Sequence, residues 1–151
     1  MYLSRSRLAE TTFTNADETE LEGLLSEFGV QIVHPEALSL QEQIELFNRH
    51  SVFIGLQGSA FHNKIWCLRP LTCFMLSPYI NENYFLFDAV KGGVSHYGAV
   101  FLPREPAAGA AGLGLRTDWA ALADWLQLHG LLRPDQAARV RDKAVARATR
   151  R

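Results

Sequence analysis

The residues best suited to chemistry in this sequence lie around a glycine-containing segment, residues 51–66. The apolar run at residues 52–54 predicts a buried strand, and Gly55 and Gly58 after it favour a tight turn. Ser59 is placed to cap a following helix. A helix N-terminus attracts anions, because free backbone N–H groups meet the positive end of the helix dipole there. The segment therefore indicates a phosphate site, and a turn that only requires small residues is the alternative.

Further charged residues are expected at the same edge of a parallel sheet. Arg5 and Arg7 follow the first predicted strand, residues 2–4, and Glu36 follows the second, residues 30–33. Ligands of such sheets bind beyond the carboxyl ends of the strands. Arginines together with peptide N–H groups suit the phosphates of a nucleoside diphosphate, and a carboxylate suits a ribose hydroxyl.

The elements that would position these residues alternate between short apolar strands and helices of about ten residues. Strands are predicted at residues 2–4, 30–33, 52–54, 71–76 and 96–102, and helices after Asn15, Ser39, Ser59, near residues 84–90, from residue 118 and from residue 134. Asn15 and Ser39 each precede a glutamate by three residues, as in a capping box. The pattern predicts an α/β fold, a Rossmann-like parallel sheet with helices on both faces.

Residues 1–132 are expected to form one Rossmann-like donor-binding domain. Within it, residues 103–116 are rich in Ala, Gly and Pro without periodicity and predict a mobile loop. Residues 133–151 predict a basic helix or a frayed tail. The chain from Arg139 onward holds six basic residues and one acidic residue, a net charge of +5. No other basic face accompanies it, so a solvated helix is favoured over nucleic-acid binding.

The composition is that of a soluble globular protein, with 48% hydrophobic and 21% charged residues. No apolar run approaches the roughly 18 residues that a membrane-spanning helix needs, so no transmembrane segment is expected. Cys67 and Cys73 are expected to be buried free thiols, which are compatible with a cytoplasmic location. The sequence contains no Asp-x-Asp motif. Neither a metal site nor another cofactor is expected.

Four motifs in order resemble glycosyltransferase family 61. They are Tyr2-Leu3-Ser4-Arg5, Asn15 before an acidic helix, Pro35-Glu36-x-Leu38-Ser39-x-x-Glu42-Gln43, and Gly55-x-x-Gly58-Ser59-Ala60-x-x-Asn63. The resemblance covers roughly the first 80 residues. It implies an inverting enzyme of the GT-B type that acts in polysaccharide or glycan synthesis. This chain would be the C-terminal, donor-binding half, with a nucleotide-sugar donor, in particular a UDP-sugar, and a glycan acceptor.

The same resemblance implies roles for single residues. Arg5 would hold the diphosphate, Gly58 and Ser59 would lie at the phosphate turn, and Asn63 would support that turn. Gln57 occupies a position where the family usually has a histidine. Glutamine can donate a hydrogen bond to phosphate or sugar, but it cannot carry a proton near neutral pH. A non-catalytic nucleotide-sugar-binding or interaction domain is therefore the alternative to an active enzyme.

An inverting transfer also needs a base that deprotonates the acceptor hydroxyl. Glu36 and His34 are the candidates in this chain, and either could instead be a turn residue. In the GT-B fold the base often comes from the N-terminal acceptor domain. We therefore expect such a domain, a second subunit or a homodimer to complete the site. Phe61, Trp66, Tyr79 and Phe85 are more aromatic residues than one ligand needs. They belong either to the core, which is favoured for Phe61 and Trp66, or to an exposed apolar patch, and a patch around Tyr79 would indicate dimerisation or a partner chain.

Overall fold

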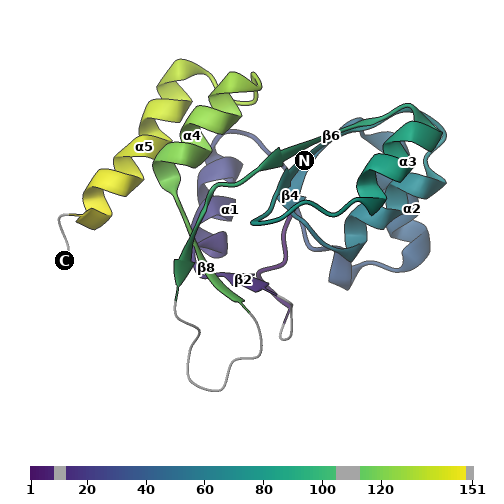
Figure 1. Cartoon of the computed structure of the whole chain (residues 1–151), viewed down its shortest axis with the longest axis horizontal. Helices are drawn as coiled ribbons and strands as arrows, with labels where there is room; N and C mark the ends of the chain where they lie inside the picture. Colours follow the sequence, from purple (N-terminus) through teal and green to yellow (C-terminus); the bar gives the residue numbers. More distant parts are fainter. Residues whose placement is uncertain (9–12, 105–112, 149–151) are drawn as a thin grey trace. The chain divides into compact units, whose positions relative to one another are not determined.

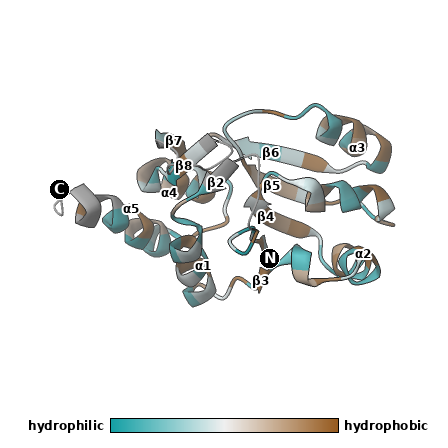
Figure 2. Ribbon diagram, turned by 90° about the horizontal axis from the view of Figure 1, so that it is seen from below, coloured by the Kyte–Doolittle hydropathy of each residue, from teal (hydrophilic) through white to brown (hydrophobic). Residues whose placement is uncertain are grey.

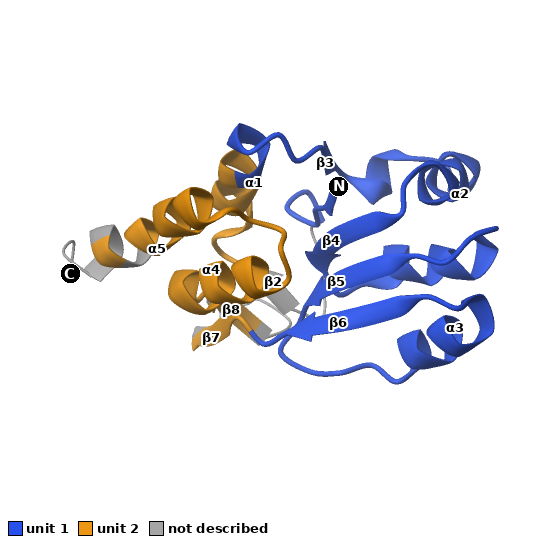
Figure 3. Ribbon diagram, turned by 90° about the horizontal axis from the view of Figure 1, so that it is seen from above, with its two compact units in different colours: residues 1–9, 25–99 blue, residues 10–24, 100–151 orange. Residues whose placement is uncertain are grey.

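A computed structural model describes residues 1–8, 13–104 and 113–148 of the chain (Figure 1). The chain forms two compact units (Figure 3). The first comprises residues 1–9 and 25–99, and the second comprises residues 10–24 and 100–151. Each unit has a β-sheet of its own.

The first unit is built on a five-stranded parallel sheet, whose strands lie side by side in blue in Figure 3. The strands are β1 (Tyr2–Leu3), β3 (Ile32–Val33), β4 (Val52–Leu56), β5 (Thr72–Leu76) and β6 (Val94–Gly98). Their order in the sheet is β3-β1-β4-β5-β6, and all four pairings are parallel. With the helices that flank this sheet, the predicted Rossmann-like α/β class is confirmed.

Helices lie between consecutive strands of this sheet along the chain, because parallel strands need a crossover connection. They are α1 (Glu18–Glu27), the 3₁₀ helix η1 (Pro35–Ala37), α2 (Leu40–Arg49), the 3₁₀ helix η2 (Ser59–Trp66) and α3 (Asn83–Lys91). The predicted capping box at the start of α2 is confirmed. The Ser39 hydroxyl accepts a hydrogen bond from the Glu42 backbone N–H, and the Glu42 carboxylate accepts one from the Ser39 backbone N–H. Helix α3 ends at Gly92, which adopts a left-handed φ of 70°.

One apolar core lies among β1, β4 and β5 and the helices α2, η2 and α3. Its buried members are Leu3, Phe47, Phe53, Phe61, Cys67, Leu71, Cys73, Met75 and Tyr84. The brown, apolar segments of β4 and β5 are visible in Figure 2. The same unit buries an ion pair, in which the Lys64 ammonium contacts the Asp88 carboxylate and donates to the Ser95 hydroxyl at 2.9 Å. Because Lys64 is only 1% exposed, this pair is part of the core rather than of the surface.

The second unit contains a three-stranded sheet and two long helices. The strands are β2 (Phe13–Asn15), β7 (Phe101–Arg104) and β8 (Leu113–Thr117), in the order β2-β8-β7. Strand β8 pairs parallel with β2 and antiparallel with β7. Helices α4 (Trp119–Leu128) and α5 (Pro134–Ala148) follow, so the C-terminal basic segment is helical up to residue 148. Over the ranges described here, no helix is both long and apolar enough to cross a membrane.

Strand β2 and the ends of the expected loop differ from the prediction. Asn15 does not directly precede a helix as predicted, because α1 begins at Glu18. It ends β2, its side-chain amide donates to the Thr117 hydroxyl, and its side-chain oxygen accepts from the Asp17 N–H. Residues 103–104 and 113–116, expected in a loop, belong to β7 and β8. Residues 105–112 lie outside the described residues.

The predicted strand at residues 96–102 is divided between two sheets. Strand β6 ends at Gly98, which pairs with Leu76, the last residue of β5. Strand β7 begins at Phe101 and pairs with β8 instead. The apolar composition continues through both segments, and the break occurs where the first partner strand ends.

Candidate ligand site

The order of strands in the parallel sheet reverses between β1 and β4. From β1 the chain continues to β3 on one side, and from β3 it continues to β4 on the other side of β1. In open parallel sheets ligands bind at such a switch point, outside the carboxyl ends of the strands. Ser4 and Arg5 follow β1, and Gln57 and Gly58 follow β4. The topology therefore places these residues where the fold favours a ligand.

A pocket of about 280 Å³ opens at this switch point. It is lined by Leu3, Ser4, Arg5, Leu8, Pro35, Glu36, Gln43, Leu56, Gly58, Ser59, Ala60, Phe61 and Asn63. Small-molecule sites commonly measure about 300–1,000 Å³, so this pocket can enclose part of a large ligand. Five of the predicted site residues meet in it: Arg5, Glu36, Gly58, Ser59 and Asn63.

Arg5 lies against the turn that follows β4. Its Nη1 donates a hydrogen bond to the Gln57 carbonyl at 2.7 Å. A Cβ atom added to Gly58 would lie 3.3 Å from both Cδ and Nη1 of Arg5. The absence of a side chain at Gly58 therefore allows the guanidinium to approach the backbone of the turn. Because Arg5 also lines the pocket, its guanidinium lies where an anionic ligand would meet it.

The turn continues directly into η2, and the residue at the N-cap position of this helix differs from the prediction. Gly58, not Ser59, occupies the N-cap position, and no side chain caps this helix. The Phe61 N–H donates to the Gly58 carbonyl at 3.0 Å, which starts a tight 3₁₀ turn one residue earlier than expected. Gly58, Ser59 and Ala60 all line the pocket. The first N–H groups of a helix have no acceptor within it, so this end of η2 offers donors.

Asn63 connects η2 to the segment that carries Glu36. Its side-chain amide donates to the Gln43 side-chain oxygen at 2.7 Å. The Gln43 amide donates in turn to the carbonyls of Pro35 and Leu38, at 2.9 and 3.2 Å. These bonds fix η1 beside the pocket. Gln43 was not predicted as a site residue, although it closes the motif that begins at Pro35.

The other predicted residues lie outside the pocket lining. Gly55 lies within β4, where an added Cβ would be 2.5 Å from the Leu3 carbonyl oxygen. Gln57 is only 4% exposed, and its side-chain oxygen has no hydrogen-bond partner in the described part of the chain. Arg7 is exposed on the turn after β1.

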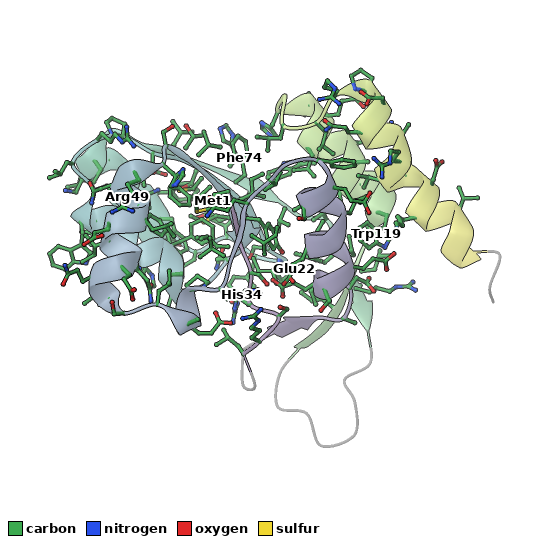
Figure 4. All side chains as sticks on the ribbon, turned by 180° about the vertical axis from the view of Figure 1, so that it is seen from behind. Met1, Glu22, His34, Arg49, Phe74 and Trp119 are labelled. Atoms are coloured by element: carbon green, nitrogen blue, oxygen red, sulfur yellow. The ribbon has the colours of Figure 1, made fainter. Side chains whose placement is uncertain are left out.

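His34, labelled in Figure 4, lies near the second base candidate but not in the pocket lining. Its Nδ1 is 3.7 Å from the Glu36 carboxylate oxygen, which is longer than a hydrogen bond. Of the two candidates for a general base, Glu36 alone lines the pocket. Among residues 1–8, 13–104 and 113–148, no group of three or more His, Cys, Asp or Glu side chains is placed to hold a metal ion.

Comparison with known proteins connects this pocket to one family. Residues 1–75 match the family model described as Glycosyltransferase 61. Neither the curated proteins nor the solved structures gave a significant match. The matched segment includes both strands of the switch point and every residue that lines the pocket. This part of the chain is therefore similar to glycosyltransferase family 61, which supports a general glycosyltransferase function.

Proposed function

We propose that the chain is the donor-binding part of a family 61-type glycosyltransferase. The pocket at the carboxyl ends of β1 and β4 holds the diphosphate of a nucleotide sugar, in particular of a UDP-sugar. The observation that supports this most is the position of Arg5, which lies across Gly58 in a pocket formed entirely by the family-matched segment.

The proposed pocket supplies the charges that a diphosphate needs. The Arg5 guanidinium faces one side of the turn, and the N–H groups at the start of η2 lie on the same turn. Both stabilise the negative charge that grows on the diphosphate as the sugar departs. In this scheme Arg5 and the peptide N–H groups carry out the task that a metal ion performs in other enzymes. The Glu36 carboxylate accepts a hydrogen bond from a hydroxyl of the ribose or of the sugar.

The proposed reaction inverts the anomeric carbon. A base takes the proton of the acceptor hydroxyl, the hydroxyl oxygen attacks the anomeric carbon, and the bond from that carbon to the diphosphate breaks. Glu36 is the candidate base in this chain because it lines the pocket. A GT-B acceptor domain, a second subunit or a homodimer provides the glycan site. The reaction serves polysaccharide or glycan synthesis in the cytoplasm, where the free thiols of Cys67 and Cys73 persist.

A non-catalytic nucleotide-sugar-binding domain is the second candidate. Gln57 occupies the position of the usual histidine, and its side chain is buried outside the pocket lining. Restoring the histidine, Gln57→His, separates the two candidates in a transfer assay with UDP-sugars. Turnover gained by the variant supports a weakened enzyme. Donor binding without turnover in both proteins points to the missing acceptor half, and supports a binding domain only if turnover is still absent when that half is supplied.

The donor-site proposal is tested by calorimetric titration of the chain with UDP and a panel of UDP-sugars. Arg5→Ala and Arg7→Ala form a matched pair, because both remove one arginine from the same segment and only Arg5 lines the pocket. A hydrogen bond to a charged group contributes about 1.5–3 kcal/mol, so Arg5→Ala should weaken UDP binding by about tenfold or more. Arg7→Ala should change it by less than about threefold. No UDP binding by the unmodified chain, or equal losses in both variants, would contradict the proposal.

A further inference from the structure

The turn after β4 is held by a second side chain that comes from a distant part of the sequence. Tyr84, in α3, donates its hydroxyl hydrogen bond to the Gly58 carbonyl at 2.8 Å. Arg5 donates to the preceding carbonyl, that of Gln57, at 2.7 Å. Two consecutive carbonyl groups of the turn are thus each fixed by one side-chain donor. Tyr84 lies outside the segment that matches the family model, residues 1–75.

The Tyr84 ring cannot easily move away from this contact. The side chain is 1% exposed and lies among three rings. The ring of His62 stacks on it at 5.2 Å, and those of Phe61 and Phe87 meet it edge to face at 6.3 and 6.2 Å. Rings held from several sides keep one orientation. The hydroxyl therefore remains directed at the Gly58 carbonyl.

The hydroxyl itself is not needed for the packing of this ring. Phenylalanine would fill the same space among the aromatic neighbours, and a buried hydroxyl is unfavourable unless it forms a hydrogen bond. Burial raises the pKa of Tyr84 well above its ordinary range, so the group keeps its proton and donates at neutral pH. The function of the hydroxyl is thus its bond to the turn.

Fixing a carbonyl also fixes the N–H group of the next residue. The two groups share one planar peptide unit and point in opposite directions. The side-chain bonds to the carbonyls of Gln57 and Gly58 therefore orient the Gly58 and Ser59 N–H groups, together with the Phe61 N–H, which also donates to the Gly58 carbonyl. Gly58 and Ser59 both line the pocket. A change at Tyr84 is consequently transmitted to the groups that would meet a ligand.

We propose that Tyr84 is a positioning residue for the diphosphate of the donor. Its hydroxyl, held by α3, orients the peptide units after β4 so that the Gly58 and Ser59 N–H groups face the phosphate oxygens. This inference rests on the proposed function, because the diphosphate is the ligand assigned there.

A matched control distinguishes positioning from general support of the fold. The Tyr97 hydroxyl also donates to a backbone carbonyl, that of Asn81, at 3.0 Å. Asn81 precedes α3, and neither Tyr97 nor Asn81 lines the pocket. Tyr84→Phe and Tyr97→Phe each remove one oxygen atom and one hydrogen bond to the backbone of the same unit. Only Tyr84→Phe disturbs the turn.

The first measurement needs no ligand. We expect Tyr84→Phe to shift the backbone amide signals of Gly58 and Ser59 in ¹H–¹⁵N correlation spectra, and Tyr97→Phe to leave them in place. The second measurement is calorimetric titration with UDP. One neutral hydrogen bond corresponds to about fivefold in affinity, so Tyr84→Phe should bind UDP about fivefold more weakly and Tyr97→Phe within about twofold.

The outcomes separate this inference from the proposed function. Unchanged Gly58 and Ser59 signals in Tyr84→Phe would overturn it, as would wild-type affinity for UDP in that variant. Equal losses of affinity in both variants would also overturn it, because the effect would then come from the fold around α3. If the unmodified chain does not bind UDP, the proposed function fails and the diphosphate role of Tyr84 fails with it. The spectra without ligand would still decide whether Tyr84 orients the turn.

Discussion

Gly55→Ala and Gly58→Ala are the same chemical change, and we predict different consequences for them. The first should lower the stability of the protein, and the second should weaken UDP binding. Gly55 lies in β4, directly opposite Leu3 of β1. A Cβ atom at Gly55 would lie 2.5 Å from the Leu3 carbonyl oxygen and 3.1 Å from the Leu3 Cβ. The three atoms nearest to a Cβ at Gly58 all belong to the Arg5 side chain, at 3.3–3.4 Å. The first substitution therefore presses on backbone, and the second presses on a flexible side chain.

The size of each effect depends on whether backbone or a side chain has to move to make room for the added methyl group. At Gly55 the two strands must separate, and overpacking of this kind costs about 1–3 kcal/mol or more. A loss of about 3 kcal/mol lowers Tm by about 6–12 °C in a chain of this length. At Gly58 the backbone is extended, with a φ of −176°, and tolerates alanine without strain. Stability should change by less than about 1 kcal/mol, while displacement of Arg5 weakens UDP binding by about tenfold.

Thermal unfolding followed by circular dichroism, together with UDP titration, measures both effects. Gly55→Ala should unfold at a clearly lower temperature, and Gly58→Ala should unfold near the wild-type temperature but bind UDP weakly. Wild-type Tm in Gly55→Ala would refute the close approach of β1 and β4. Wild-type affinity in Gly58→Ala would refute the assignment of Arg5 and this turn to the ligand site.

Two further substitutions and one labelling experiment test the contacts around the site and the core. Asn63→Ala removes the donor to Gln43 and should lower the free energy of unfolding by about 1–3 kcal/mol in urea titrations. Lys64→Met leaves the partly buried Asp88 carboxylate without its cation and should lower the free energy of unfolding by about 3 kcal/mol. Burial raises the pKa of Cys73 to about 12, so its thiol should resist a thiol reagent at pH 8 until the protein unfolds.

Exposed counterparts provide the controls for these substitutions. Gln41→Ala removes a surface hydrogen bond to Glu45, and Arg49→Ala removes a surface ion pair to the same residue. Each should change stability by less than about 1 kcal/mol. Equal effects of Lys64→Met and Arg49→Ala would contradict the buried character of the Lys64 pair. Rapid labelling of Cys73 in the native protein would contradict its burial.

The parallel sheet was predictable because its strands are short apolar runs separated by clear turns and caps. The three-stranded sheet was not predictable in the same way. Strand β8 lies in a segment with many glycines and alanines, and its pairing with β2 joins residues about a hundred positions apart. Propensity describes local preference, whereas such a strand is stabilised by its partners. Asn15 illustrates the same effect, because it lies in β2 and bonds to Thr117, 102 positions away in the chain.

At the site, local motifs identified Arg5, Gly58 and Asn63, which the structure brings to one pocket. A motif gives the order of residues but not the direction of each side chain. Gln57, adjacent to Gly58, is buried outside the pocket lining, and the motif gave no indication of this. The contribution of Tyr84 was missed because it depends on one hydrogen bond across 26 residues, between a helix and a turn. No sequence pattern in the chain indicates such a bond.

The carboxyl ends of β1 and β4 form the proposed binding site for a nucleoside diphosphate. The most direct test is titration of the ¹⁵N-labelled chain with UDP, followed by amide signals assigned to single residues. We expect saturable shifts, with one common Kd, at Ser4, Arg5, Gly58 and Ser59. Absence of shifts at millimolar UDP, or saturable shifts confined to residues of the second unit, would contradict it.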